Sequence, residues 1–185
     1  MRPISRKQTV LVASMLFSAL SFEVMAPACR GAEMPPATQR EAAVPETSWG
    51  KKINGLQVRI RECPEKDRKE GKVMMIFEVR NTSEKPVEFC WWQSPFEKRC
   101  TAGRFKVTGP DGGEVAYEGI MVKRRPPSRE NGDFVTLRSG WTLAVTFDLK
   151  EAYPSMKAGS TYSITYEGTV MGPLPASNTV SIALK

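Results

Sequence analysis

The sequence predicts an all-β fold, a two-sheet antiparallel sandwich of about eight or nine short strands. From Asn54 onward, apolar residues recur with a period of two, and turn-forming residues separate these runs at spacings of roughly ten residues. After the N-terminal segment, no window of helix length carries apolar residues at i, i+3, i+4 and i+7. The chain therefore has the pattern of β-strands and lacks that of amphipathic helices.

The first two strands are predicted at residues 56–61 and 73–79. In the first, apolar residues alternate with Gln and Arg, which predicts a half-buried strand with a basic outer face. In the second, both faces are at least partly apolar, which favours a central strand. Residues 66–70 are predicted to form a charged turn between these strands, and residues 81–86 turn the chain after the second.

The middle of the chain continues the alternation with Val87, Phe89 and Trp91, followed by a loop at 93–102. A short strand at 105–107 ends at Gly-Pro-Asp-Gly-Gly, a strong hairpin signal because Gly supplies positive φ and Pro presets a turn. The return strand is predicted at 115–122, from Val115, Tyr117, Ile120 and Val122. Residues 123–132 form a basic loop that contains proline.

The last strands have the clearest pattern. Residues 134–137 lead to a Ser139-Gly140 turn, and five alternating positions from Trp141 to Leu149 are expected to point inward. Residues 162–166 alternate Tyr, Ile and Tyr with polar residues, and residues 180–184 close the chain. Tyr162 begins the first of these two strands and is expected to return its hydroxyl to nearby backbone, as in a tyrosine corner.

Residues 1–32 have the pattern of a secretory signal peptide, residues 33–52 that of a flexible linker, and residues 53–185 that of the folded domain. A basic start is followed by an apolar stretch too short to span a membrane, with cleavage expected after Ala28 or Ala32. Cleavage after Ala28 would expose Cys29 for lipid attachment, although the preceding residues match a lipid-attachment box poorly. The linker is rich in Pro, Ala, Glu and Thr. We therefore expect a secreted, periplasmic or cell-envelope protein without a transmembrane span in its mature form.

Charge and composition exclude several classes of function. The chain has no His, which removes zinc sites of the HExxH type, Ser/His/Asp and Cys/His nucleophiles and every imidazole base. Without residues 1–32, 23 basic residues face 19 acidic ones, and a net charge of +4 is not typical of a nucleic-acid-binding protein. No spacing of acidic residues or Cys indicates a calcium or zinc site. We expect no enzymatic activity, no cofactor and no metal.

The cysteines are expected to form a disulfide, since export leads to an oxidising compartment. Cys90 and Cys100 are the favoured pair, because they flank a short excursion of nine residues. Cys63 is then left free, pairs with Cys29 if that residue survives processing, or replaces one of the assumed partners.

Two segments are candidate interaction surfaces. Trp91 and Trp92 are adjacent on a predicted strand, so only one of them can enter the core, and with Phe96 they offer an aromatic anchor for a protein or glycan. Lys123, Arg124 and Arg125 concentrate positive charge that suits an acidic partner or a polyanion. The alternatives are that the second Trp covers a sheet edge and that the basic run is a solvated connection.

A family resemblance rests on several short motifs. They are Tyr-Glu-Gly-Ile-Met-Val-Lys-Arg-Arg at 117–125, Leu-Arg-Ser-Gly at 137–140, Val-Thr-Phe-Asp-Leu at 145–149, Ala-Tyr at 152–153, and the unit Phe-Glu-Val-Arg-Asn-Thr-Ser at 77–83 with Pro-Val-Glu-Phe at 86–89. In order and spacing they resemble the non-catalytic, immunoglobulin-like domain that precedes the zinc peptidase domain of deuterolysin and peptidyl-Lys metalloendopeptidases. The peptidase half and its two zinc-binding His residues are missing here, so no catalytic residue can be carried over.

The resemblance implies an immunoglobulin-like β-sandwich that acts beside a protease as a pro-segment or accessory module. A weaker resemblance is to intracellular-type bacterial proteinase inhibitors. We therefore expect a secreted, non-enzymatic module that binds a protein, either a protease or a component of the cell envelope. The alternatives are an envelope structural or stress protein without a specific target and a small carbohydrate-binding sandwich that uses Trp91, Trp92 and Phe96.

Overall fold

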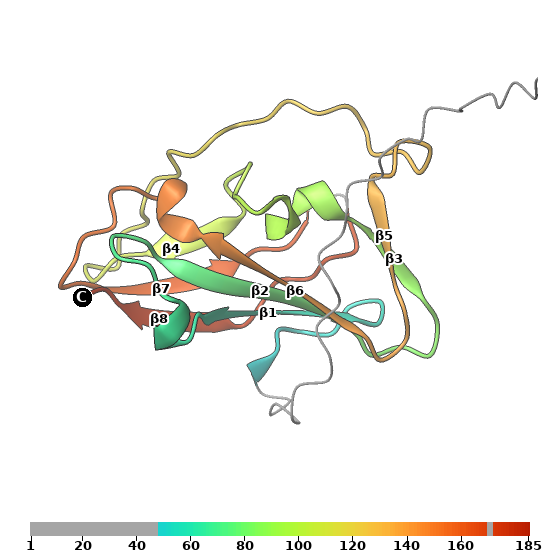
Figure 1. The fold of residues 1–185 in the computed structure, drawn as a ribbon, viewed down its shortest axis with the longest axis horizontal. Helices are drawn as coiled ribbons and strands as arrows, with labels where there is room; N and C mark the ends of the chain where they lie inside the picture. Colours follow the sequence, from blue (N-terminus) through green and yellow to red (C-terminus); the bar gives the residue numbers. More distant parts are fainter. Residues whose placement is uncertain (1–47, 170–171) are drawn as a thin grey trace, which may run out of the picture. The chain divides into compact units, whose positions relative to one another are not determined.

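The computed structural model describes residues 48–169 and 172–185, and within them it confirms the all-β, antiparallel, sandwich-like fold (Figure 1). One sheet has the order β1-β2-β6 and the other the order β4-β7-β8. A two-stranded ribbon, β3-β5, adds to the two predicted sheets. The described strands are β1 (Leu56–Glu62), β2 (Met74–Asn81), β3 (Val87–Cys90), β4 (Phe105–Thr108), β5 (Phe134–Leu137), β6 (Thr142–Asp148), β7 (Thr161–Tyr166) and β8 (Thr179–Ala183). The signal peptide, its cleavage sites, Cys29 and residues 33–47 lie outside the described residues.

The core lies between the two three-stranded sheets and follows the apolar alternation. In the register of β1 and β2, Val58 pairs with Val79 and Ile60 with Phe77, and all four side chains are fully buried. Across the sandwich, the Phe77 ring meets Tyr166 of β7 edge-on at 4.9 Å between centroids. Burial of this continuous apolar surface is the main stabilising contribution that the alternation encodes.

The basic outer face predicted for β1 is covered rather than solvated. Arg59 and Glu78 are 5% and 3% exposed and form an ion pair at 2.5 Å. The Trp49 ring lies against both Arg59 and Arg80, at 4.6 Å and 4.2 Å from ring centroid to guanidinium carbon. The backbone N–H of Gly50 donates to Val58 O at 2.9 Å. The expected linker is therefore wrong at its end, because residues 48–50 pack on the first sheet.

Gly50 shows how closely this segment approaches its neighbours. A Cβ atom placed there would lie 2.2 Å from the carbonyl oxygen of Ala176 and 2.8 Å from Cα of Ser177. Only glycine allows two backbones to meet at that separation. The segment that carries Trp49 is thus fitted between the first sheet and the chain that leads into β8.

Two predicted strand positions are wrong. Residues 115–122 do not form a strand: after an isolated bridge between Thr108 and Glu114, the chain continues as a long loop to β5. Trp141 is 46% exposed, because it belongs to a tight turn in which its N–H donates to Arg138 O at 3.1 Å. The inward row of β6 therefore begins at Leu143. Gly140, as expected for the turn, has φ of +72°.

The side chains of two buried residues hold the turns in place. Asn81 is 1% exposed, donates to the carbonyls of Lys85 (2.7 Å) and Leu137 (2.9 Å), and accepts from Ser83. Although Asn-Thr-Ser is formally a glycosylation acceptor, both amide hydrogens are used inside the fold. The hydroxyl of Tyr162 accepts from the backbone N–H of Lys157 at 2.7 Å, which is the geometry of a tyrosine corner.

Candidate protein-binding surface

The two candidate segments, distant in sequence, lie against each other. We define the first loop as residues 91–104 and the second loop as residues 115–133. The Trp91 indole N–H donates to Gly132 O at 3.0 Å, and the Tyr117 hydroxyl donates to Cys100 O at 3.1 Å. In Figure 1 the second loop runs from the β4 region to the β3-β5 ribbon and passes over the short turns of the first loop. The structure thus joins the aromatic and basic candidates in one surface.

The first loop is shaped by two consecutive 3₁₀ turns, Trp91–Gln93 and Pro95–Glu97. Between them, the Ser94 hydroxyl donates to Trp91 O at 2.8 Å and accepts from the Phe96 N–H at 3.5 Å. Pro95 suits the first position of a helical turn, because its ring fixes φ and the missing N–H has no partner there. Lys98 ends the second turn in the left-handed region, with φ of +64°.

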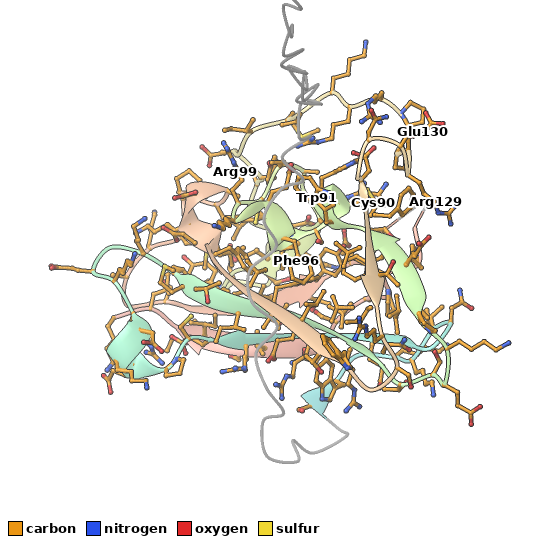
Figure 2. The ribbon with its side chains drawn as sticks, turned by 45° about the vertical axis from the view of Figure 1, so that its right-hand side comes forward. Cys90, Trp91, Phe96, Arg99, Arg129 and Glu130 are labelled. Atoms are coloured by element: carbon orange, nitrogen blue, oxygen red, sulfur yellow. The ribbon has the colours of Figure 1, made fainter. Side chains whose placement is uncertain are left out.

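The three aromatic candidates have different roles. Phe96 points toward the sheets, with its ring centroid 5.7 Å from those of Phe77 and Phe89 (Figure 2). Trp91 is half-buried, and its indole N–H is used by the second loop. Trp92 is half-buried, with Arg124 at 5.1 Å from its ring centroid. Trp91 and Trp92 do not face opposite sides of a strand as predicted, because β3 ends at Cys90 and both residues lie in a 3₁₀ turn.

The basic run is partly tied to carboxylates. Arg124 forms an ion pair with Glu97 of the first loop, and Arg125 forms one with Asp133 at 2.7 Å. A backbone hydrogen bond from Ser128 and the guanidinium of Arg125 lower the pKa of Asp133 below its ordinary value. Lys123 is exposed. Arg124 therefore connects the two loops, while Arg125 closes the second loop on itself.

A cavity of about 100 Å³ lies between the two loops. Its lining is largely apolar and includes Trp92, Pro95, Cys100, Ala102, Phe105 and Val122. Arg104 and Arg124 also line it and bring positive charge, beside the polar residues Gln93, Ser94 and Thr101. This arrangement suits the binding of an apolar group with negative charge near it.

Sequence reasoning missed part of this surface. Ile120, Met121 and Val122 are 56%, 74% and 42% exposed, and Val122 lines the cavity. The strand expected at 115–122 does not suit these residues, because the three apolar residues are consecutive and a half-buried strand would place a polar residue between them. This break in the alternation, directly before Lys123, is the signal that could have identified the segment.

The predicted Cys90–Cys100 disulfide is not formed, and Cys63, Cys90 and Cys100 are free thiols. Cys90 ends β3 opposite Phe134, whereas Cys100 belongs to the main core and lines the cavity. Burial raises the pKa of the Cys90 thiol to about 11 and that of Cys100 to about 12. Since the thiolate is the reactive form, these side chains act as small apolar groups at neutral pH.

The described residues lack two further features. No cluster of His, Cys, Asp and Glu within 48–169 and 172–185 has an arrangement that could hold a metal ion. In the same residues, no helix has the length and apolar character needed to cross a membrane.

Comparison with known proteins gives one informative match. No protein-family model matches the chain. Over 88 residues it is 40% identical to a protein described as an extracellular protease from Aeromonas hydrophila, and the match covers 48% of this chain and 24% of that protein. The chain thus spans about a quarter of the length of the relative it matches. About half of the chain is related in sequence to part of an extracellular protease.

Proposed function

We propose that this protein is an exported, non-enzymatic, immunoglobulin-like module that binds a protease as an accessory, pro-segment or inhibitor domain. The observation that carries the proposal is the 40% identity to a quarter of an extracellular protease. A segment shared with only part of a protease suits a domain that accompanies the catalytic one. The resemblance to the domain that precedes the deuterolysin-type peptidase supports the same assignment.

The chemistry of the chain supports binding rather than catalysis. The absence of His removes the commonest general base and the zinc ligands of the related peptidases. The raised pKa values of Cys90 and Cys100 make thiolate chemistry unfavourable near neutral pH. The two loops, in contrast, present exposed apolar residues beside positive charge, a combination that suits a protein partner.

Export is part of the proposal and rests on the N-terminal sequence. The basic start and short apolar stretch of residues 1–32 direct the chain out of the cytoplasm, to the periplasm, the cell envelope or the medium. Its relative is described as extracellular, which agrees with this destination. Cleavage after Ala28 would make lipid attachment at Cys29 an additional route to the envelope.

The test is a titration of secreted metallo-, serine and cysteine proteases with the purified protein, following residual protease activity and cleavage of the protein itself. We expect saturable binding to one class, weakened by Trp92→Ala and Arg124→Ala. Trp141→Ala and Arg138→Ala are matched controls, because Arg138 also lies 5.1 Å from a Trp ring centroid, but at the β5–β6 turn.

Three results would count against the proposal. Turnover of hydrolase substrates by the repurified protein itself would show that it is an enzyme. No binding to any of the three classes would favour an envelope structural or stress protein. Trp fluorescence changes on titration with polysaccharides would favour a carbohydrate-binding module, although Phe96 faces the core and is not available to a flat aromatic platform.

A further inference from the structure

We propose that the cavity between the first and second loops binds one branched apolar side chain of an acidic peptide segment on the partner protein. The identification of that partner as a protease rests on the proposed function. The chemistry of the segment rests on the cavity, on the exposed apolar residues beside it and on the charge of both loops.

The cavity has the size and lining for one aliphatic side chain. Its volume is about 100 Å³, about two-thirds of the roughly 150 Å³ of an engineered apolar cavity that binds benzene. Trp92, Phe105 and Val122 supply apolar walls, and the Cys100 thiol, whose pKa burial raises to about 12, adds no charge. Transfer of a leucine side chain from water into such a site is favourable.

Exposed apolar residues extend this surface beyond the cavity. Ile120 and Met121 precede Val122 and are 56% and 74% exposed. The backbone N–H of Val122 reaches Thr101 O at 3.4 Å, which places the run beside the first loop. Three exposed apolar residues in sequence, next to an apolar cavity, are the kind of patch that marks a protein interface.

The positive charge around the cavity favours a partner segment that carries negative charge. The first and second loops together contain seven basic and four acidic residues. Two of the four acids are already paired, Glu97 with Arg124 and Asp133 with Arg125. Lys98, Arg99 and Lys123 are exposed, and Arg104 lines the cavity. Carboxylates that flank the inserted side chain would therefore be attracted, and lysines would be repelled.

An acidic peptide fits both parts of this surface, whereas a polyanion fits only one. Nucleic acid or polyphosphate would meet the basic residues but would offer no branched aliphatic group to the cavity. A neutral apolar peptide would fill the cavity but leave the basic residues without complementary charge. We therefore assign the site to a short segment in which an aliphatic residue lies between Asp and Glu residues.

The test uses three N-acetylated, C-amidated pentapeptides and ¹⁵N-labelled protein observed by NMR. The first peptide is Glu-Asp-Leu-Asp-Glu, the second has Gly in place of Leu, and the third is Lys-Lys-Leu-Lys-Lys. We expect the first to shift the resonances of the Trp92 indole and Val122 amide saturably and to leave the Trp141 indole unchanged. Replacing Leu by Gly should weaken binding about tenfold or more, and the lysine peptide should not bind.

Two independent variants test the cavity, so that the test still stands if one of them fails to fold. Ala102→Leu fills the cavity and Val122→Asp places a carboxylate at a site that is 42% exposed. Each should reduce affinity for the Leu peptide at least tenfold while the rest of the NMR spectrum stays that of the native fold. Trp141→Ala should leave the affinity unchanged. Raising NaCl from about 0.1 M to about 1 M, which shortens the Debye length from about 10 Å to about 3 Å, should weaken binding.

Equal binding of the Leu and Gly peptides, or binding of polyphosphate as tight as that of the Leu peptide, would overturn the proposal in favour of a general anion site. Absence of shifts at Trp92 with all three peptides would also overturn it. Protease binding without peptide binding would refute this inference and leave the proposed function standing. Peptide binding without protease binding would support this inference and refute the proposed function.

Discussion

The Phe96→Ala substitution tests whether Phe96 is a core residue or an anchor for a binding partner. The sequence offered Phe96 as part of an exposed aromatic surface, but the structure packs its ring against Phe77 and Phe89, both fully buried. Phe96→Ala should therefore lower the free energy of unfolding. Trp92→Ala, which removes a half-exposed ring beside Arg124, should mainly affect binding.

The magnitudes follow from burial and ring contacts. A fully buried Phe→Ala change costs about 3–5 kcal/mol, and aromatic pairs contribute about 0.5–1.5 kcal/mol beyond their buried area. Because Phe96 is only partly buried, we expect a loss of about 2–3 kcal/mol, or about 3 °C in melting temperature per kcal/mol for a domain of this size. Trp92→Ala loses a cation–π contact of about 0.5–1 kcal/mol and some packing, so about 1 kcal/mol is expected.

Urea denaturation followed by far-UV circular dichroism measures both values without depending on the Trp that is removed. The protease titration, carried out at urea concentrations well below the unfolding midpoint of each variant, measures the affinity of each variant for the protease. Phe96→Leu is the control, since it keeps apolar volume and should recover more than half of the lost stability. If Phe96→Ala were as stable as the wild-type protein within about 0.5 kcal/mol and lost partner binding, the assignment of Phe96 to the core would be wrong.

Three further predictions concern buried polar groups. Asn81→Ala leaves the carbonyls of Lys85 and Leu137 without their donor and should cost about 2–4 kcal/mol in urea denaturation. Glu78→Ala removes the carboxylate that pairs with buried Arg59 and should cost about 3–5 kcal/mol, whereas Arg61→Ala, on a more exposed partner of the same carboxylate, should cost about 1 kcal/mol or less. Above about pH 9 stability should fall, because the unfolded chain ionises its thiols near 9 while the native pKa values of Cys90 and Cys100 are about 11 and 12.

Each of these has an outcome that contradicts it. A glycosylated, natively folded protein carrying sugar on Asn81 would show that the amide is not held inside the fold. Equal losses for Glu78→Ala and Arg61→Ala would mean that burial of the pair does not determine its contribution. The thiol prediction is checked with iodoacetamide at about pH 8: rapid alkylation of the native protein would contradict the raised pKa values, and alkylation only after unfolding would support them.

Most strands could be predicted because their pattern is local. Alternation of apolar and polar residues reports a half-buried strand wherever one face packs and the other does not. It located the paired segments of β1, β2, β6 and β7 to within a residue or two. The prediction failed at Trp141. The alternation of apolar residues continues there, but the chain is still in a turn, and the geometry of that turn depends on backbone hydrogen bonds with Asn81 across the fold.

The outer face of the first sheet shows a second kind of limit. Gln57, Arg59 and Glu78 have the residue types of a solvated face, yet each is no more than 5% exposed. Trp49, distant from Glu78 in sequence, supplies the cover, and Gly50 permits the close approach. The alternation therefore placed these polar residues on the outer face of the sheet, but it could not predict that another segment would cover that face.

The sequence by itself determined the all-β class, the absence of imidazole chemistry and the two segments that carry aromatic and basic residues. Those properties follow from composition and from a short-range period. The tertiary structure alone decided that the two segments form one surface, that Phe96 turns inward, that Ile120, Met121 and Val122 stay exposed, and that Cys90 and Cys100 remain apart. These outcomes depend on which residues meet across the fold, and alternation fixes the face of a strand without fixing its neighbours.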